Sequence, residues 1–321
     1  MNASPSAANR VAAVDCGTNS IRLLIADVLP DGRLADVHRE MRIVRLGQGV
    51  DATGSLAPEA IERTRVALAD YAALMRDAGV DRVRMVATSA TRDAANREDF
   101  FGMARAELGS VVPGAEAEVI TGDEEARLSF TGAIGELSSE AGPFVVVDLG
   151  GGSTELVFGD SDGVKAAYSA DIGCVRITER CLPGNPPTAE QVAAAREFAT
   201  ERLTEAFERV PVDGAHTWVG VAGTMTTIAA VALDLPEYDS ERVHLTSLTL
   251  DQVREVCDRL ISMDHDQRAA LGPIHPGRVD VIGGGGVITE VLAYELSRRA
   301  GISALVVSEH DILDGIALSI A

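Results

Sequence analysis

The fold is predicted by one stretch, Val14-Asp15-Cys16-Gly17-Thr18-Asn19-Ser20-Ile21-Arg22-Leu23-Leu24-Ile25. Its pattern recurs at Val147-Asp148-Leu149-Gly150-Gly151-Gly152-Ser153-Thr154-Glu155-Leu156-Val157-Phe158, where Val, Asp, Gly, Ser and Leu coincide and the apolar positions agree throughout. Each copy is typical of a buried strand, an Asp, a glycine-bearing turn and a second apolar strand. One Asp–x–Gly turn is common by chance, but two copies with the same flanking strands indicate an internal repeat.

The segments between and after the two copies alternate strand and helix signals. The predicted elements are a helix over 58–78 that stops at Gly79, a strand over 83–87 followed by the turn 88–92, a helix from Thr188, and strands over 218–221, 279–282 and 305–307. Two of these strands meet glycine-rich turns, at Gly223-Thr224 and at Gly283–Gly286. Strands that alternate with helices predict α/β layers with ligands at the strand ends.

The chain is long enough for two cores, since a single hydrophobic core stops growing near ~250–300 residues. We therefore expect two homologous α/β domains, residues 1–125 and 126–307, which face each other across a central cleft. A final helix at about 308–321 is expected to fold back onto the first domain.

Composition excludes several classes of protein. The chain is 46% hydrophobic and 24% charged and contains no stretch typical of a membrane span or a signal peptide, so a cytoplasmic protein is expected. A net charge of −21 argues against nucleic-acid binding. The four cysteines form no CxxC pair, and His265-Asp266 and the remaining histidines show no metal-ligand spacing.

Both glycine turns are candidate phosphate sites, because glycine lets the backbone approach a phosphate and consecutive amides bind anions. Carboxylates at the strand ends suit Mg²⁺ or another divalent cation. The expected metal ligands are Asp15, Asp148 and Glu155. The expected phosphate ligands are Gly17, Thr18, Asn19, Ser20, Arg22, Ser89, Arg92, Gly150, Gly151, Gly152, Ser153, Gly223, Thr224 and Gly284.

Arg22 and Arg92 are the candidate phosphate clamps, since a guanidinium binds two phosphate oxygens at once. Arg22 holds the repeat position that Glu155 holds in the second copy, so one turn is suited to grip phosphate and the other metal. Each arginine could equally form a surface salt bridge. Ser89 and Thr91 could equally be helix caps.

The segment Thr121-Gly122-Asp123-Glu124-Glu125-Ala126-Arg127 supplies the candidate general base. Thr121 and Glu124 have the spacing of a capping box, which would leave Glu125 to point elsewhere from the first helical turn. A carboxylate there could take a proton from an attacking water. Glu124 and Glu125 are both candidates, with Glu125 favoured; Asp123 is explained by the helix dipole.

The chain resembles the exopolyphosphatase / guanosine pentaphosphate phosphohydrolase family of the actin–sugar-kinase–Hsp70 fold. The resemblance is carried by residues 11–28, 87–96, 118–132 (EVITGDEEARLSFTG), 145–159 (VVVDLGGGSTELVFG), 220–230 and 276–286 (PGRVDVIGGGG). It implies two actin-like (ribonuclease H-like) domains. Relatives with an additional C-terminal helical domain are longer, so this chain resembles the short form.

The resemblance also implies roles for particular residues. Glu125 matches the family's catalytic base, Arg92 a ligand of the terminal phosphate, and Asp148 and Glu155 the metal-site acids. The chain departs from the pattern near residue 313: where relatives often have G-L-R-E-G, it has Asp311-Ile312-Leu313-Asp314-Gly315. The role of that arginine is therefore in doubt here.

The expected activity is release of terminal orthophosphate from inorganic polyphosphate, with Glu125 as general base and Mg²⁺ as cofactor. Three alternatives stay open: hydrolysis of guanosine pentaphosphate, a kinase-like phosphotransferase, and a non-catalytic sensor of polyphosphate or of guanosine penta- or tetraphosphate. We also expect a homodimer.

Overall fold

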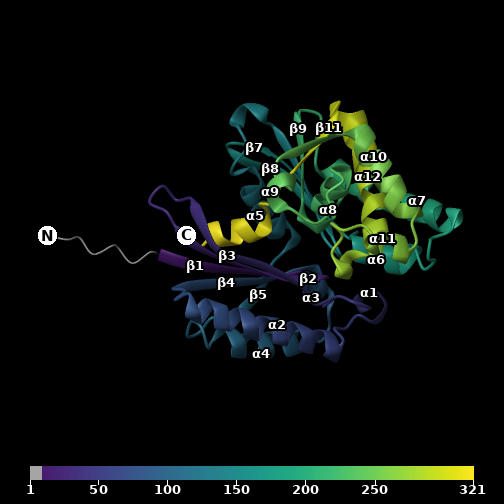
Figure 1. Cartoon of the computed structure of the whole chain (residues 1–321). Coiled ribbons are helices and arrows are strands. Elements are labelled where there is room, and N and C mark those ends of the chain that lie inside the picture. The colour runs from purple at the N-terminus through teal and green to yellow at the C-terminus, as the bar shows by residue number, and fades with distance from the viewer. Residues whose placement is uncertain (1–8) are drawn as a thin grey trace. The chain divides into compact units, whose positions relative to one another are not determined.

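The structure is a computed structural model that describes residues 9–321 and consists of two compact α/β units (Figure 1). Unit 1 contains the chain up to Thr121 together with Ile312–Ala321, and unit 2 contains Gly122–Asp311. The division falls immediately before a helix, α5, whereas the sequence placed it four residues inside that helix, after 125.

Unit 1 is built on a five-stranded sheet of order β3-β2-β1-β4-β5. β1, β2 and β3 pair antiparallel, and β4 and β5 continue the sheet parallel to β1. The strands are β1 (Asn9–Cys16), β2 (Ser20–Val28), β3 (Leu34–Ile43), β4 (Arg82–Ala87) and β5 (Ala117–Val119).

Helices cover both faces of this sheet, so consecutive residues of its central strands are buried, as over 11–14 of β1 and 23–26 of β2. The helices are α1 (Val50–Thr53), α2 (Pro58–Asp77), α3 (Ser89–Asp93), α4 (Arg97–Leu108) and α13 (Ile312–Leu318). α2 and α4 lie together on one face, and α13 lies on the other, against β1 (Figure 1). A bidentate ion pair joins Arg39 of β3 to Asp314 of α13, at 2.5 and 3.1 Å.

Unit 2 is built on a six-stranded sheet of order β10-β11-β9-β6-β7-β8. β6, β7 and β8 pair antiparallel, β9 and β11 run parallel to β6, and β10 closes the edge antiparallel. The strands are β6 (Phe144–Leu149), β7 (Thr154–Asp160), β8 (Gly163–Ala170), β9 (Thr217–Val221), β10 (Thr246–Thr249) and β11 (Ala304–Val307).

A single helix covers one face of this sheet and a layer of helices covers the other. α5 (Gly122–Ile134) packs Ala126, Phe130 and Ala133 against alternate residues of the central strands, Val146 among them. The other helical segments are η1 (Ser139–Ala141), α6 (Cys174–Cys181), α7 (Ala189–Arg209), α8 (Ala222–Ala232), α9 (Ser240–Val243), α10 (Leu250–Ser262), α11 (His265–Ala269), η2 (Pro276–Arg278) and α12 (Ile282–Ala300).

The predicted internal repeat is confirmed strand by strand. The two sheets agree in strand order and direction: β1 to β5 of unit 1 match, in turn, β6, β7, β8, β9 and β11 of unit 2. Strand β10 is present only in the sheet of unit 2. The turn after the first strand is closed by the same hydrogen bond in both copies. The amide of Gly17 donates to Ser20 O at 2.9 Å, and the amide of Gly150 donates to Ser153 O at 3.1 Å.

Two predicted helices begin where their cap signals indicate. α2 begins at Pro58, a residue suited to a first helical position because it has no amide hydrogen to satisfy. α7 begins after Thr188, whose hydroxyl accepts from the amide of Gln191 while the Gln191 side chain accepts from the amide of Thr188.

The predicted strand over 279–282 is wrong. Residues 279–281 form a turn, and Gly283–Gly286 lie in the first turns of α12. A Cβ on Gly284 would lie 2.3 Å from Thr178 Oγ1, and one on Gly285 would lie 2.5 Å from Thr224 Cγ2. The glycines therefore allow α12 to pack closely on α6 and α8, a tertiary requirement that has no local sequence signal.

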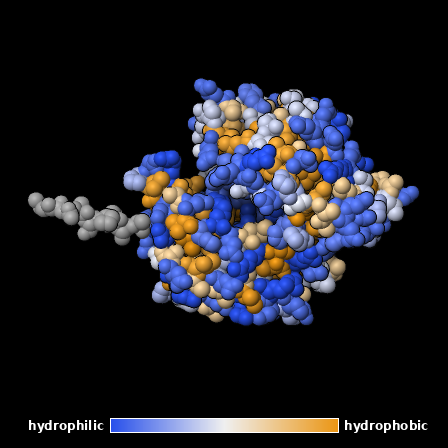
Figure 2. Space-filling view, viewed as in Figure 1, coloured by the Kyte–Doolittle hydropathy of each residue, from blue (hydrophilic) through white to orange (hydrophobic). Residues whose placement is uncertain are grey.

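The surface is that of an acidic protein with mixed polarity. Figure 2 shows hydrophilic residues over much of the face in view, with apolar residues in smaller groups between them. Across residues 9–321, no helix is both long and apolar enough to cross a membrane.

We predict that Phe130→Ala lowers the free energy of unfolding of unit 2 by about 3–5 kcal/mol, the usual cost of truncating a buried aromatic side chain. Phe130 is 1% exposed and is the largest side chain by which α5 packs on the sheet. Urea denaturation measures the change. Thr131→Ala, an exposed position on the same helix, is the control; a loss below about 1 kcal/mol for Phe130→Ala contradicts the packing assigned to α5.

Candidate functional site

The first glycine turn, residues 17–20, is supported from one side by the segment that follows β3. Thr18 O accepts from the amide of Gly47 at 2.8 Å, and Asn19 O accepts from the amides of Val44 and Arg45 at 3.0 and 2.9 Å. A Cβ on Gly47 would lie 2.4 Å from Thr18 Cγ2. The carbonyl oxygens of the turn are thus fixed by main-chain donors.

The second turn, residues 150–153, is supported in the same way by the segment that follows β8. The amide of Cys174 donates to Gly150 O at 3.0 Å, and the amide of Val175 donates to Gly151 O at 2.9 Å. A Cβ on Gly173 would lie 2.4 Å from the carbonyl carbon of Gly151, so only glycine fits there.

This support leaves main-chain amides available on both turns. Within residues 9–321, the amides of Asn19, Gly151 and Gly152 donate no hydrogen bond. Amides in a glycine turn whose carbonyls are already bonded on one side form an anion-binding site. The role of both turns in binding phosphate stays a prediction.

Asp15 and Arg22, predicted to bind metal and phosphate respectively, bind each other. They are cross-strand neighbours, and Arg22 Nε and Nη2 donate to Asp15 Oδ2 at 3.0 and 2.7 Å. Asp15 is 5% exposed, so this pair neutralises a buried carboxylate. A metal ion on Asp15 would have to compete with a guanidinium already in place.

The remaining predicted residues of unit 1 lie around α3. Ser89 Oγ is 2.9 Å from Thr18 Oγ1, which joins α3 to the first turn. Arg92 Nη1 donates to Ile120 O at 3.1 Å. The N-cap of α3 is Thr88, so neither Ser89 nor Thr91 occupies the cap position that was the alternative for both.

Asp148 and Glu155 are cross-strand neighbours at the corresponding place in unit 2 and are 6% and 1% exposed. Ser129 Oγ of α5 donates to Asp148 Oδ2, and Ser169 Oγ of β8 donates to Glu155 Oε1 at 2.6 Å. Two buried carboxylates opposite each other repel, and a divalent cation relieves that repulsion. Their donor set fits Mg²⁺.

α5 carries both predicted glutamates in its first turn. Glu125 is 7% exposed and Glu124 only partly buried, while Asp123 pairs with Arg127 at 2.9 Å on the outer side. Ser129 lies one helical turn after Glu125, so its bond to Asp148 links the helix of Glu125 directly to the carboxylate pair. Sequence reasoning missed Ser129, because a serine within a helix carries no motif.

Gly223 and Thr224 lie in the first turn of α8, directly after Ala222, which has a φ of 68°. A Cβ on Gly223 would lie 2.2 Å from Cζ of Arg278, so this guanidinium rests against the glycine. Arg278 was not among the predicted site residues. It belongs to the segment 276–286 on which the resemblance depends, and that is the signal that could have found it.

Gly284 lines a separate pocket of about 230 Å³ near the start of α12, together with Thr178, Asn185, His265 and Arg268. Its position inside a helix differs from the predicted turn after a strand.

Cys16 is the last residue of β1, directly before the first turn, and is 1% exposed. Burial, and to a smaller extent the neighbouring Asp15 charge, raises the pKa of its thiol. A thiol with a raised pKa is a poor nucleophile, which agrees with its interpretation as a filler residue. All four cysteines are free.

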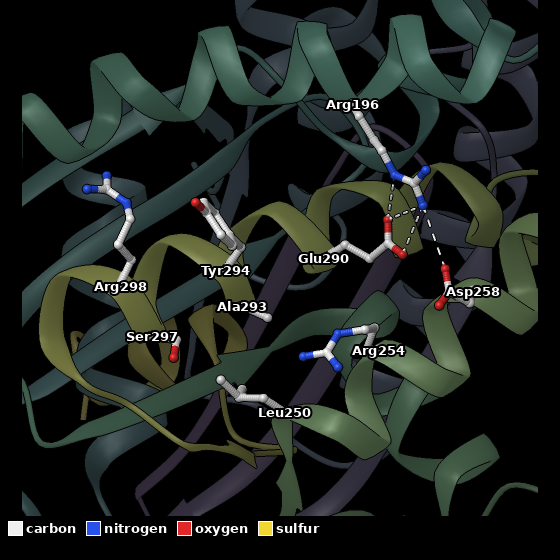
Figure 3. Close-up of a pocket in the computed structure, with 9 residues that line it drawn as sticks. All are labelled: Arg196, Leu250, Arg254, Asp258, Glu290, Ala293, Tyr294, Ser297 and Arg298. Carbon is white, nitrogen blue, oxygen red and sulfur yellow. Dashed lines mark hydrogen bonds and ion pairs between the residues drawn. The ribbon is translucent and has the colours of Figure 1, made fainter. Parts of the chain in front are cut away.

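A larger pocket, of about 480 Å³, lies between α7, α10 and α12 and contains none of the predicted residues (Figure 3). Arg196 Nε and Nη2 donate to Glu290 at 3.0 and 3.2 Å, and Arg196 Nη2 lies 3.6 Å from Asp258 Oδ1. Desolvation and the nearby Asp258 raise the pKa of Glu290 to about 7, against the opposing effect of Arg196.

We predict that Glu290 makes stability pH-dependent. Its pKa is raised in the folded state, so the folded chain binds this proton more tightly than the unfolded chain. The resulting stabilisation is complete below about pH 4.5 and is lost as pH rises to about 7. Glu290→Gln removes that dependence; the check is urea denaturation across this range, with exposed Glu255→Gln as control. If the free energy of unfolding changes with pH in the same way in Glu290→Gln and in the unmodified protein, Glu290 is not the source of the dependence.

The fold and the site define a class of protein. Two actin-like α/β units, each with an Asp–Gly turn, together with a buried glutamate on a helix that is hydrogen-bonded to a pair of buried carboxylates, are typical of phosphate-hydrolysing enzymes of the actin-like fold. The Ppx/GppA phosphatase family model matches residues 24–320. The chain belongs to the Ppx/GppA phosphatase family.

Three relatives illustrate the similarity. The chain is 63% identical over 318 residues to Exopolyphosphatase 2 of Mycobacterium tuberculosis, covering 98% of this chain and 99% of the relative. A crystal structure of an exopolyphosphatase-like protein is 43% identical with a TM-score of 0.90, covering 96% of this chain and 98% of that one. The Aquifex aeolicus Ppx/GppA family member is 34% identical with a TM-score of 0.77, covering 97% and 96%.

Proposed function

We propose that this phosphatase is an exopolyphosphatase, which releases terminal orthophosphate from inorganic polyphosphate by hydrolysis of a phosphoanhydride bond. The name of the 63% identical relative supports this substrate. The observation that carries the proposal is the position of Glu125, buried in the first turn of α5 and linked through Ser129 to the carboxylate pair of Asp148 and Glu155.

Each unit offers its own main-chain amides and guanidinium groups to phosphate. The donors are the amide of Asn19 in unit 1 and the amides of Gly151 and Gly152 in unit 2. Arg22, oriented by Asp15, and Arg92, oriented by Ile120 O, add positive charge. Arg278, which lies against Gly223 at the start of α8, gives unit 2 a guanidinium of its own. Phosphoryl transfer asks a protein mainly for positioning and charge stabilisation of this kind.

Mg²⁺ is the proposed cofactor, held by Asp148 and Glu155. When bound, it neutralises negative charge on the phosphate oxygens. Ser129 and Ser169 orient the two carboxylates. Asp15, predicted from the sequence as a third ligand, is assigned a different role: it orients Arg22 and does not bind the ion, because its buried charge is already compensated.

Glu125 is the proposed general base. A carboxylate oxygen of Glu125 accepts a proton from the attacking water, and burial keeps bulk solvent from competing for that carboxylate. Glu124, which is more exposed on the same turn, is assigned no part in the proton transfer.

We predict that Glu125→Gln lowers kcat for phosphate release from polyphosphate by about 10²–10⁴-fold, the usual contribution of a general base. The melting temperature should stay near that of the unmodified protein, since the amide is isosteric. Phosphate release is measured with short polyphosphate, long polyphosphate and guanosine pentaphosphate, and Glu124→Gln is the control. Near-normal turnover by Glu125→Gln would show that Glu125 is not the general base. If the unmodified protein hydrolyses guanosine pentaphosphate but neither polyphosphate, polyphosphate is not its substrate.

We predict that Ser129→Ala weakens Mg²⁺ binding or activity by about 10–100-fold, as loss of a group that orients a metal ligand does. The Mg²⁺ concentration at half-maximal rate and the Mg²⁺-induced rise in melting temperature both measure the effect. Ser262→Ala, a serine bonded to Arg259 O at the end of α10, is the matched control. Unchanged Mg²⁺ dependence in Ser129→Ala would show that the hydroxyl does not orient Asp148.

A further inference from the structure

Three potential metal ligands converge in unit 2 on loops that are far apart in the chain. Glu136 follows the end of α5, His244 lies between α9 and β10, and His310 lies between β11 and α13. Among residues 9–321, this is the one group of three His, Cys, Asp or Glu side chains whose ligand atoms lie within 4.8 Å of one another. None of the three belongs to the proposed phosphatase site.

Both imidazoles point a nitrogen at the same carboxylate. His244 Nε2 lies 2.8 Å from Glu136 Oε2, and His310 Nε2 lies 3.8 Å from Glu136 Oε1. The rings meet edge to face, with centroids 4.8 Å apart and planes at 75°. One nitrogen of each ring and one carboxylate oxygen lie within 4.8 Å of one another.

The separations suit a small tetrahedral ion. Metal–ligand bonds of about 2.0–2.2 Å place tetrahedral ligand atoms about 3.4 Å apart. The two nitrogen–oxygen separations, 2.8 and 3.8 Å, lie on either side of that value, and the ligand atoms all lie within 4.8 Å of one another, so side-chain movements of about 1 Å complete the site. Two imidazoles and one carboxylate form a donor set that prefers Zn²⁺ to Mg²⁺. We propose that Glu136, His244 and His310 bind one zinc-like divalent ion.

One hydrogen bond opposes this binding and sets its cost. The amide of Glu309 donates to His244 Nδ1 at 3.1 Å, which leaves the proton of the neutral ring on Nε2. Coordination through Nε2 moves that proton to Nδ1 and breaks the bond from Glu309. The shift leaves two N–H donors facing each other, and an unsatisfied donor corresponds to a loss of roughly 5- to 150-fold in affinity. That loss is small compared with the affinity a set of two histidines and a carboxylate gives for Zn²⁺.

The ion serves as a cross-link between loops and takes no part in the hydrolysis. α5 has 13 residues and is about 20 Å long, so Glu125 in its first turn and Glu136 beyond its last residue lie at opposite ends. The loop of His310 also bonds to β9, since the amide of Ser308 donates to Gly220 O at 3.0 Å. The ion therefore joins the end of α5 to the edge of the central strands.

The test is Zn²⁺ binding to the full chain after removal of metals with a chelator, by calorimetry in the presence of excess Mg²⁺. We expect one Zn²⁺ per chain and a rise in melting temperature. Co²⁺ should give the visible spectrum of a tetrahedral site. We expect the Kd for Zn²⁺ to rise by at least about 100-fold in each of Glu136→Ala, His244→Ala and His310→Ala. This is more than the effect of removing a group that only hydrogen-bonds to a metal ligand.

Two control variants make the outcome decisive. His265→Ala removes a histidine that lies 3.3 Å from both Asp266 and Asp280 but has no second histidine beside it, and it should bind Zn²⁺ normally. Asp148→Asn tests whether Zn²⁺ instead occupies the carboxylate pair, and it should also bind normally. The proposal is overturned if the unmodified protein does not bind Zn²⁺. It is also overturned if the three ligand variants bind Zn²⁺ as tightly as the unmodified protein, or if Asp148→Asn loses Zn²⁺ binding.

Discussion

The hydrogen bond that closes each Asp–Gly turn is the constraint from which the rest of the molecule follows. In both units it joins the amide of the turn glycine to the carbonyl oxygen of the serine three residues later. The bond reverses a buried strand within four residues and sets an aspartate opposite the residue seven positions on. The segment after the third strand then fixes the carbonyls of the turn, and close contact there requires Gly47 in one unit and Gly173 in the other.

Once the backbone is fixed in this way, a single residue distinguishes the charge of the two copies. The position opposite the aspartate is Arg22 in unit 1 and Glu155 in unit 2. An arginine neutralises the neighbouring aspartate, while a glutamate doubles the buried negative charge, which a divalent ion would offset. The duplicated fold thus supplies one neutral and one negatively charged pair from nearly the same main-chain geometry.

The sequence predicted what is repeated or local and missed what depends on distant packing. The two turns, the start of α2 at Pro58 and the cap of α7 at Thr188 have local signals, and the structure contains all of them. Gly283–Gly286 were misinterpreted because a glycine needed for helix contact has the same local pattern as one needed for a turn. Ser129 and the cluster of Glu136, His244 and His310 have meaning only through partners far along the chain, so no spacing rule finds them.

The position of α13 affects how the protein can be synthesised. Its residues Ile312, Leu313 and Ile316 are buried, and the helix lies on β1, one of the first segments to be made. Unit 2, in contrast, is one continuous stretch of chain. Because domains form as their chain emerges from the ribosome, unit 2 can be complete while one face of the first sheet still waits for its cover. An apolar sheet face exposed for that interval is a natural target for a chaperone.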